Sequence, residues 1–352
     1  MTTRLFLLRA MDFIARNLPD SLTGTPCSGD GIALSPLLHW ILMLRPETDF
    51  TQLGVAAMRE RFRKDMIGLR AGYAIAGTGD FVIDTPSARL PVRRYLPLKE
   101  NSLPVLLVFF HGGGFVMGDI ETHDDLCRLI CRTAGVQVLS VDYRRAPEHP
   151  FPGPPQDCLD AFRWAQEHAE DFGVHESAVA VGGDSAGANL ATVTALMARQ
   201  DRPALSQLLF YPGTDRTPNS VPPGSRRRAF LTPEIRNWFY LQYLGSGEHE
   251  AWNPLVSPLN AESLADMPPA VLVTAGFDIL RNEGQAYSAA LARHGNKVVP
   301  LHFARLDHGF GNLVGPHRES EHAVIEAARA WRSLSEVTLK ASKTELSHSW
   351  KR

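Results

Sequence analysis

A serine within a short glycine-flanked motif is the residue of this chain best suited to nucleophilic chemistry. Gly183-Asp184-Ser185-Ala186-Gly187 follows an apolar run at 178–182 that favours a strand, and it opens a stretch at 186–199 that favours a helix. On such a turn the backbone is strained, the serine hydroxyl is pushed out above the sheet edge, and side chains two residues to either side would collide. A lone G-x-S-x-G recurs by chance, so the prediction depends on this strand and helix. We expect Ser185 to be a nucleophile and Asp184 to be structural.

A run of three glycines has the composition of a hydrogen-bond donor loop. His111-Gly112-Gly113-Gly114-Phe115 comes directly after the apolar run at 104–110. Glycines at the carboxyl end of a buried strand leave backbone N–H groups facing a crevice, where the oxyanion of an acyl-transfer intermediate would form. A plain strand-to-helix turn and a phosphate-binding loop are the alternatives, although the run is not G-x-G-x-x-G and no basic residue follows in P-loop position. We expect Gly112, Gly113 and Gly114 to line an oxyanion hole and His111 to be structural.

The nucleophile needs a base, and the base needs a carboxylate that orients it. In a sheet of this kind the order along the chain is serine, then an acid, then histidine, each on a loop after a strand. Asp278 lies just past the apolar run at 270–275, and His308 lies just past the run at 297–303 with a glycine after it. We therefore expect His308 to be the base and Asp278 to be its partner.

Other carboxylates and histidines fit these roles less well. Asp307 is adjacent to His308 in the chain, which places it badly to accept from its neighbour's ring, and Glu283 fits a helix-start carboxylate better. The other late histidines belong to a predicted strand or helix: His302, His317 and His322. No histidine pair has HExxH or HxH spacing, so we predict no metal site, and the chemistry needs no cofactor.

Composition narrows the class of protein and its surroundings. The 352 residues carry 36 basic and 38 acidic side chains, and the net charge of −2 argues against a nucleic-acid partner. The apolar start at 5–8 is interrupted by Arg9, Asp12 and Arg16, so we expect neither a signal peptide nor stable membrane insertion. Four cysteines without CxxC or metal-ligand spacing favour a reducing, cytoplasmic compartment.

Most of the chain alternates between short apolar runs and amphipathic stretches. We expect strands at 104–110, 136–142, 178–182, 206–211, 270–275 and 297–303. We expect helices at 121–134, 156–170, 186–199, 282–294 and 317–334. Strands that are apolar on both faces and separated by helices predict an α/β fold with a mostly parallel sheet covered on both sides.

Three regions depart from this alternation. Residues 1–75 read as helices and loops, with amphipathic stripes at 7–18 and 55–69, of which the first fits a docked surface helix or a lid with weak lipid contact. Residues 213–265 are rich in proline, glycine, arginine and aromatic residues and interrupt the spacing of the strands. Residues 336–352 are polar, and we expect a loose tail. The catalytic domain would then span 76–335.

Five motifs in order resemble the hormone-sensitive-lipase family of α/β-hydrolases, the bacterial family IV esterases. They are HGGGF at 111–115, YRRAPEH at 143–149, GDSAG at 183–187, D-x-L at 278–280 and HGF at 308–310. The resemblance implies an α/β-hydrolase fold, the triad Ser185, Asp278 and His308, and an oxyanion hole in which Gly113 and Gly114 are the main donors beside the amide of Ala186. It also implies a mostly helical cap built from residues 1–75 and the insertion.

The resulting expectation is a serine carboxylester hydrolase for short- to medium-chain acyl esters, in a chain that can form a homodimer. Ile279, Arg145 and Ala188 stand where the family usually has proline, leucine and glycine, and none is a catalytic side chain. Candidate substrate-binding residues are Phe115, Phe230, Trp238, Phe239 and Tyr240. An amidase, deacetylase or lactonase on the same triad remains open, as do a ligand-binding homologue and a partner-binding scaffold, although the intact triad argues against a non-catalytic homologue.

Overall fold

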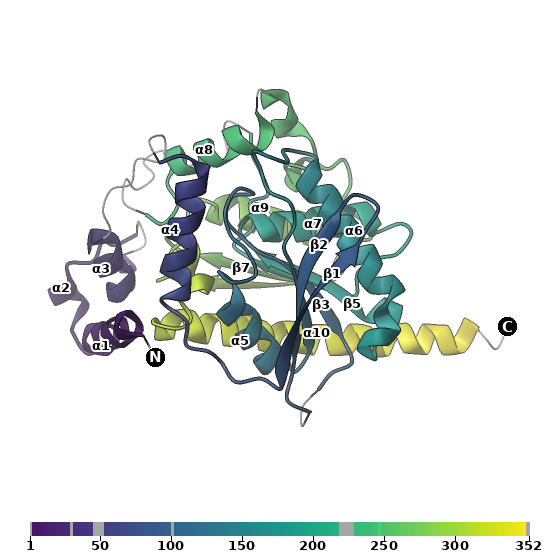
Figure 1. The fold of residues 1–352 in the computed structure, drawn as a ribbon, viewed down its shortest axis with the longest axis horizontal. Helices are drawn as coiled ribbons and strands as arrows, with labels where there is room; N and C mark the ends of the chain where they lie inside the picture. Colours follow the sequence, from purple (N-terminus) through teal and green to yellow (C-terminus); the bar gives the residue numbers. More distant parts are fainter. Residues whose placement is uncertain are drawn as a thin grey trace.

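One eight-stranded sheet organises the molecule (Figure 1). The computed structural model describes residues 2–28, 31–44, 53–99, 102–217, 229–245 and 247–349. The strand order is β1-β2-β4-β3-β5-β6-β7-β8, with β1 and β2 antiparallel to their neighbours and all other pairs parallel. The strands are β1 (Gly77–Asp84), β2 (Arg89–Leu96), β3 (Leu106–Phe110), β4 (Gln137–Val141), β5 (Val179–Asp184), β6 (Gln207–Phe210), β7 (Ala270–Ala275) and β8 (Val298–Phe303).

Helices cover both faces of the sheet. Helices α5 and α10 pack against each other on one face, and α6 and α7 pack together on the other, where α9 covers β7 and β8. The helices are α1 (Thr3–Arg16), α2 (Asp20–Thr23), α3 (Pro36–Leu44), α4 (Val55–Ile67), α5 (Asp124–Ala134), α6 (Gly153–Glu167), α7 (Ala186–Ala198), α8 (Pro233–Leu244), α9 (Arg281–Arg293) and α10 (Arg318–Ser349). Short 3₁₀ helices are η2 (Ala169–Phe172), η3 (Glu176–Ala178), η4 (Glu248–Trp252), η5 (Pro258–Asn260) and η6 (Phe310–Leu313).

The six predicted strands are present, each within two residues of its expected bounds. Every residue of β3, β5, β6 and β7 is buried, as expected for strands covered on both faces. The predicted interruption also lies between β6 and β7, where α8, η4 and η5 lie outside the sheet. Within it, residues 218–228 and 246 lie outside the described residues.

The antiparallel strands β1 and β2 were not predicted from the sequence. Their sequences, GTGDFVID and RLPVRRYL, are charged, and their burial alternates instead of running continuously. Only one face of this hairpin packs on the core, as is common for antiparallel strands. A period-of-two alternation around the turn at 85–88 was the signal that could have revealed it.

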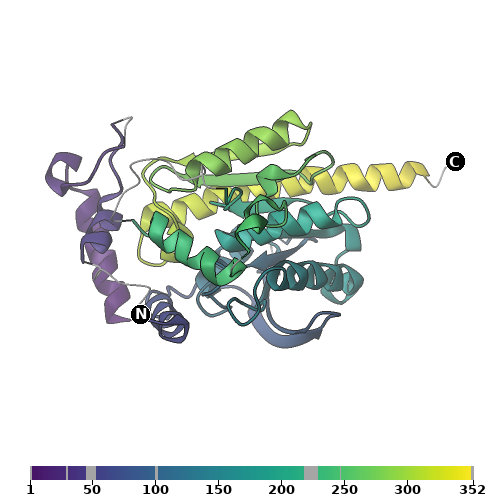
Figure 2. The same ribbon diagram turned by 90° about the horizontal axis from the view of Figure 1, so that it is seen from above.

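The expectation of a loose tail from residue 336 is wrong as far as residue 349. Helix α10 continues to Ser349 and extends beyond the body of the molecule in both views (Figures 1 and 2). Polarity does not prevent a helix: Lys340 donates to Glu336 one turn away at 2.9 Å, and Leu339 is buried. Residues 350–352 lie outside the described residues.

Helices α1 to α3 form the N-terminal helical segment (residues 2–44), which lies at one side of the body (Figures 1 and 2). Helix α1 packs on α3 and buries Leu5 and Ala15. The predicted stripe at 7–18 is only partly a docking face, because Ile14 and Leu18 are exposed.

Candidate active site

Ser185 occupies the sharp turn between β5 and α7. Its φ of 54° lies in the left-handed region, which is strained for a residue with a side chain. A Cβ on Gly183 would lie 2.4 Å from the backbone of Gly187, and a Cβ on Gly187 would lie 1.9 Å from the carbonyl oxygen of Phe110. Both positions therefore require glycine, as the sequence analysis expected. The Ser185 N–H donates to the carbonyl of Phe210 on β6 at 2.9 Å, which ties the turn to the sheet.

Three predicted side chains meet at the carboxyl edge of the sheet. Ser185 Oγ lies 2.8 Å from Nε2 of His308, and Nδ1 of the same ring lies 2.8 Å from Oδ2 of Asp278. Asp278 follows β7 and His308 follows β8, so parallel strands bring the two loops side by side. The other Asp278 oxygen accepts the N–H of Leu280 at 2.8 Å, which fixes the carboxylate.

The surroundings of His308 favour its cation. Burial lowers the pKa of the imidazole, but the negative charge of Asp278 and the hydrogen bond that its carboxylate accepts from the ring outweigh burial, with smaller contributions from the charges of Asp307 and Asp184. The pKa of His308 is therefore raised above its usual value of 6.5. A ring poised in this way can accept the proton of Ser185 at Nε2 while its Nδ1–H stays hydrogen-bonded to Asp278.

The two other carboxylates considered as partners of His308, Asp307 and Glu283, hydrogen-bond to other groups. Asp307 Oδ1 accepts the backbone N–H of His308 at 2.7 Å and does not hold its ring. Glu283 accepts the N–H of Thr214 at 2.8 Å and lies 3.3 Å from Arg236. Burial outweighs the charge of this arginine and raises the pKa of Glu283 to about 8. The carboxyl group is therefore largely protonated at neutral pH and is poorly suited to stabilise a histidine cation.

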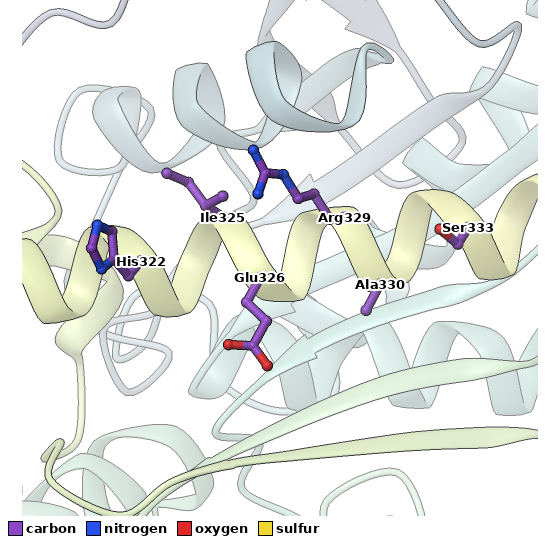
Figure 3. A pocket seen from close by; sticks show the side chains of 6 residues that line it. All are labelled: His322, Ile325, Glu326, Arg329, Ala330 and Ser333. Atoms are coloured by element: carbon purple, nitrogen blue, oxygen red, sulfur yellow. The ribbon is translucent and has the colours of Figure 1, made fainter.

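The other late histidines lie away from the nucleophile. His302 Nδ1 lies 2.9 Å from the Thr274 hydroxyl, and His317 lies between the hydroxyls of Ser35 and Ser320. His322 projects from α10 into a separate hollow beside Ile325, Glu326 and Arg329 (Figure 3). Within the described ranges, no three histidine, cysteine or acidic side chains are grouped so as to hold a metal ion.

Two backbone amides of the glycine loop, those of Gly113 and Gly114, can donate hydrogen bonds to a substrate at Ser185. Gly113 and Gly114 have φ of 118° and 63°, and Met117 and Phe239 fill the places where their side chains would be. No bond within the described chain occupies the N–H groups of Gly113, Gly114 or Ala186, and Ala186 is the first residue of α7, where an amide has no intrahelical acceptor. All three can therefore donate to a bound oxyanion.

Gly112 does not fit the predicted role of oxyanion donor. Its N–H donates to Oδ1 of Asp184 at 2.8 Å, so the amide is already used. The same Asp184 oxygen lies 3.2 Å from Nε2 of His123, and both side chains are buried. His111 Nδ1 donates to the Gly112 carbonyl at 2.8 Å. Asp184 and His111 therefore hold the glycine loop against the serine turn, which matches their predicted structural role.

Tyr211 is a residue near the reacting groups that sequence reasoning missed. Its ring meets the His308 ring edge-on at a centroid distance of 5.0 Å, and its hydroxyl accepts the N–H of Gly311 at 3.1 Å. Its φ of 38° is unusual for a residue of this size. The position at the end of β6 on the same sheet edge was the available signal.

A cavity of about 610 Å³ opens in front of Ser185. Of the predicted substrate-binding residues, Phe115, Phe230, Phe239 and Tyr240 line it. Trp238 does not line it; its ring packs edge-on against Phe239 instead. Further lining residues come from the N-terminal helices and α4, and include Leu7, Leu8, Met11, Ile41, Leu44, Phe62, Met66 and Leu69. The stripes predicted at 7–18 and 55–69 supply most of these side chains.

No helix among the described residues combines the length and apolar character needed to cross a bilayer.

Comparisons with known proteins agree with this fold. A family model described as the alpha/beta hydrolase fold matches residues 107–312. Carboxylic ester hydrolase LipN of Mycobacterium tuberculosis is 41% identical over 319 residues, which cover 86% of this chain and 84% of that protein. Esterase LipI of the same organism is 36% identical over 290 residues, covering 80% and 89%. An esterase of Pyrobaculum calidifontis has a TM-score of 0.80 at 36% identity, over 86% of this chain and 99% of that one. The chain therefore belongs to the α/β-hydrolase family, in its hormone-sensitive-lipase-like group.

Proposed function

We propose that this protein is a serine carboxylester hydrolase whose triad is Ser185, His308 and Asp278. The observation that carries the proposal is the pair of 2.8 Å contacts from Ser185 Oγ to His308 and from His308 to Asp278. The esterase names of the relatives in the same family support ester hydrolysis. Ser185 and His308 both line a cavity that can admit a substrate.

The chemistry proceeds in two halves. Ser185 attacks the ester carbonyl while His308 Nε2 takes its proton, and Asp278 stabilises the imidazolium and holds its tautomer. The amides of Gly113, Gly114 and Ala186 hold the oxyanion of the tetrahedral intermediate. His308 returns the proton to the departing alcohol, and a water molecule, activated by the same base, then releases the acid from Ser185. Apart from this water molecule, the steps use side chains and amides of this chain.

The N-terminal helices and the insertion form the proposed cap, which selects the substrate. The described residues within 1–75 and 213–265 supply one wall of the cavity, and the loops at the sheet edge, with Gly113, Ser185 and His308, supply its floor. The lining from α1, α4 and α8 is mostly apolar, with Leu8, Met66 and Ile235 as examples. Each acyl CH₂ buried there would contribute ~0.8 kcal/mol. Short- to medium-chain acyl esters fit a volume of about 610 Å³.

A fluorophosphonate probe tests the assignment directly, because it labels a serine only when a base activates it. We expect one equivalent on Ser185, located by peptide mass analysis, and none in Ser185→Ala. Matched p-nitrophenyl esters and p-nitroanilides of the same acyl group then separate an esterase from an amidase. Labelling at another serine, or faster cleavage of the anilide, would contradict the proposal.

Two further properties remain predictions. A reducing, cytoplasmic compartment is consistent with four free cysteines, three of them buried. A homodimer is testable by sedimentation equilibrium of the full chain.

A further inference from the structure

Large apolar side chains are exposed unevenly over this molecule. The described residues include fifteen exposed ones, and nine of these belong to residues 2–44. They are Phe6, Leu7, Phe13, Ile14, Leu18, Leu22, Ile32, Met43 and Leu44. Exposed apolar groups scattered singly need no explanation, whereas a concentration of them marks an interaction site. The N-terminal helical segment therefore presents a surface that some partner covers.

The exposed groups of α1 form one stripe. Phe6, Ala10 and Phe13 follow each other at helical spacing, and Leu7 and Ile14 repeat the pattern one position further on. The opposite side of the helix, with Leu5 and Ala15, is the side that packs on the protein. Helix α1 therefore has two apolar faces: one is buried against the protein, and the other is exposed to solvent.

Arginines flank this stripe. Successive residues of an α-helix are about 100° apart, which places Arg9 and Arg16 at one border of the stripe and Arg4 at the other. All three are exposed, and each also has a partner in the protein: Arg16 pairs with the buried Asp12 at 3.0 Å, Arg4 pairs with Asp65 at 2.7 Å, and Arg9 donates to the carbonyl of Gly315 at 3.0 Å. An apolar helical face bordered by basic side chains is the pattern of a helix that lies in the surface of an anionic membrane.

The stripe is continuous with the mouth of the cavity. Leu7 and Leu44 are exposed and also line the cavity that contains Ser185. A folded partner seated on these residues would obstruct the mouth. A lipid surface would leave the mouth facing a layer from which apolar molecules can enter without crossing water. The position of the stripe therefore favours a lipid surface over a second copy of this chain.

We propose that the exposed face of α1, with its neighbours on α2 and α3, docks this protein on the surface of an anionic phospholipid bilayer. Phe6, Phe13 and Ile14 enter the boundary between headgroups and acyl chains, and the flanking arginines contact the headgroup phosphates. The contact is peripheral and reversible. It does not require the proposed esterase activity.

Vesicle sedimentation of the full chain tests the proposal. The probes are vesicles of phosphatidylcholine alone and vesicles of equal parts phosphatidylcholine and phosphatidylglycerol. We expect binding to the mixed vesicles that weakens as salt is added, and much weaker binding to the neutral ones. The double variant Phe6→Ser, Phe13→Ser should bind the mixed vesicles at least about tenfold more weakly. Its hydrolysis of a dissolved short-chain ester should be unchanged, because neither residue lines the cavity.

A control variant replaces two apolar side chains of similar fractional exposure elsewhere on the molecule. Leu98 and Val337 are 52% and 56% exposed, against 56% and 64% for Phe6 and Phe13, and both lie outside the N-terminal helical segment. Leu98→Ser, Val337→Ser should bind like the parent, and so should Ser185→Ala, which separates docking from catalysis. Equal binding to neutral and anionic vesicles, or full binding by the Phe6, Phe13 variant, would overturn the proposal. A dimer in the parent that this variant converts to a monomer would overturn it too, because a second copy would then cover the stripe.

Discussion

The loops at the carboxyl edge of the sheet and the N-terminal helical segment differ in how firmly the protein holds them. Ser185 and His308 follow strands that pair in one sheet, and Asp278, Asp307 and Asp184 each accept a backbone N–H that fixes a loop. The N-terminal segment packs α1 against α3, and it joins the main core through Leu34, Leu38 and Leu42. Its α1 is tied to the rest of the chain by polar contacts, with Arg4 on Asp65, Thr2 on Gly68 and Arg9 on Gly315.

This difference separates two parts of the function. The groups proposed to perform the chemistry belong to the most constrained part of the molecule, where a displacement of one atom disturbs several hydrogen bonds. The groups proposed to choose and deliver the substrate belong to a segment whose surface residues can change without disturbing the sheet. Substitutions at the sheet edge should therefore reduce the rate, and substitutions in the N-terminal segment should change which substrate is used.

The largest effect should come from removing the nucleophile. Ser185→Ala should reduce kcat for a p-nitrophenyl ester by ~10⁶, the loss seen when the nucleophile of a triad is removed. The strain at Ser185 is in the backbone, and alanine keeps the side-chain volume small, so the thermal unfolding midpoint should stay near that of the parent. Retention of a tenth of the parent activity would refute the assignment.

The next effect distinguishes the two neighbouring carboxylates. Asp278→Asn should lower kcat by ~10⁴, because the amide stabilises the wrong tautomer of His308 and cannot balance its cation. Asp307→Asn is the matched control, because its contact is with the backbone N–H of His308, and it should cost far less. A larger loss of kcat in Asp307→Asn than in Asp278→Asn would show that Asp307, and not Asp278, is the acid of the triad.

The acid limb of the pH profile should report His308. Only the neutral imidazole accepts the proton of Ser185, and the Asp278 charge raises the pKa of His308 despite burial. The limb should therefore lie above pH 6.5, with kcat/KM falling about tenfold per unit below it. In Asp278→Asn the limb should move to lower pH, because the charge that raised the pKa is gone. A limb with a slope of two would mean that the base is not a single histidine.

A smaller loss is expected from a positioning residue. Tyr211→Phe keeps the ring against His308 but removes the acceptor of the Gly311 N–H, a bond worth about 1 kcal/mol. We expect kcat to fall about fivefold with KM unchanged, because the group acts through the histidine loop and not on the substrate. A change confined to KM would assign Tyr211 to substrate binding instead.

Much of the sheet could be predicted because burial on both faces leaves a continuous apolar signature. The run Leu106–Phe110 has no polar residue, and the same is true of Ala270–Val273. The β1–β2 hairpin carries no such signature, since half of its side chains face solvent. The end of α10 was missed for a related reason: exposed helices can be polar all round, and periodicity then says little.

The roles of the triad residues could be predicted because they follow from residue type and order along the chain. Other roles could not be predicted because they depend on which atoms meet in the folded structure. The order of serine, aspartate and histidine after successive strands is the pattern that predicted the triad, and the structure brings the three together. The amide of Gly112 could not be assigned from its type, because its use depends on the position of the Asp184 carboxylate across the turn. Trp238 and Phe239 are adjacent in sequence, and only the rotation of α8 decides which of them reaches the cavity.

The smallest effect should be a change in acyl-chain preference caused by a substitution in the N-terminal helical segment. Met11 lines the cavity from α1, and Phe13 lies on the same helix outside the cavity. Met11→Trp should fill part of the acyl space, so that kcat/KM falls several-fold for an octanoate ester and little for an acetate ester, at ~0.8 kcal/mol per CH₂ excluded. Phe13→Trp adds similar bulk outside the cavity and should leave the ratio of the two substrates unchanged. Acetate hydrolysis serves as the control for misfolding of both variants. An unchanged octanoate-to-acetate ratio in Met11→Trp would show that the acyl chain does not lie beside Met11 and would point to other lining residues, such as Phe230 and Ile235.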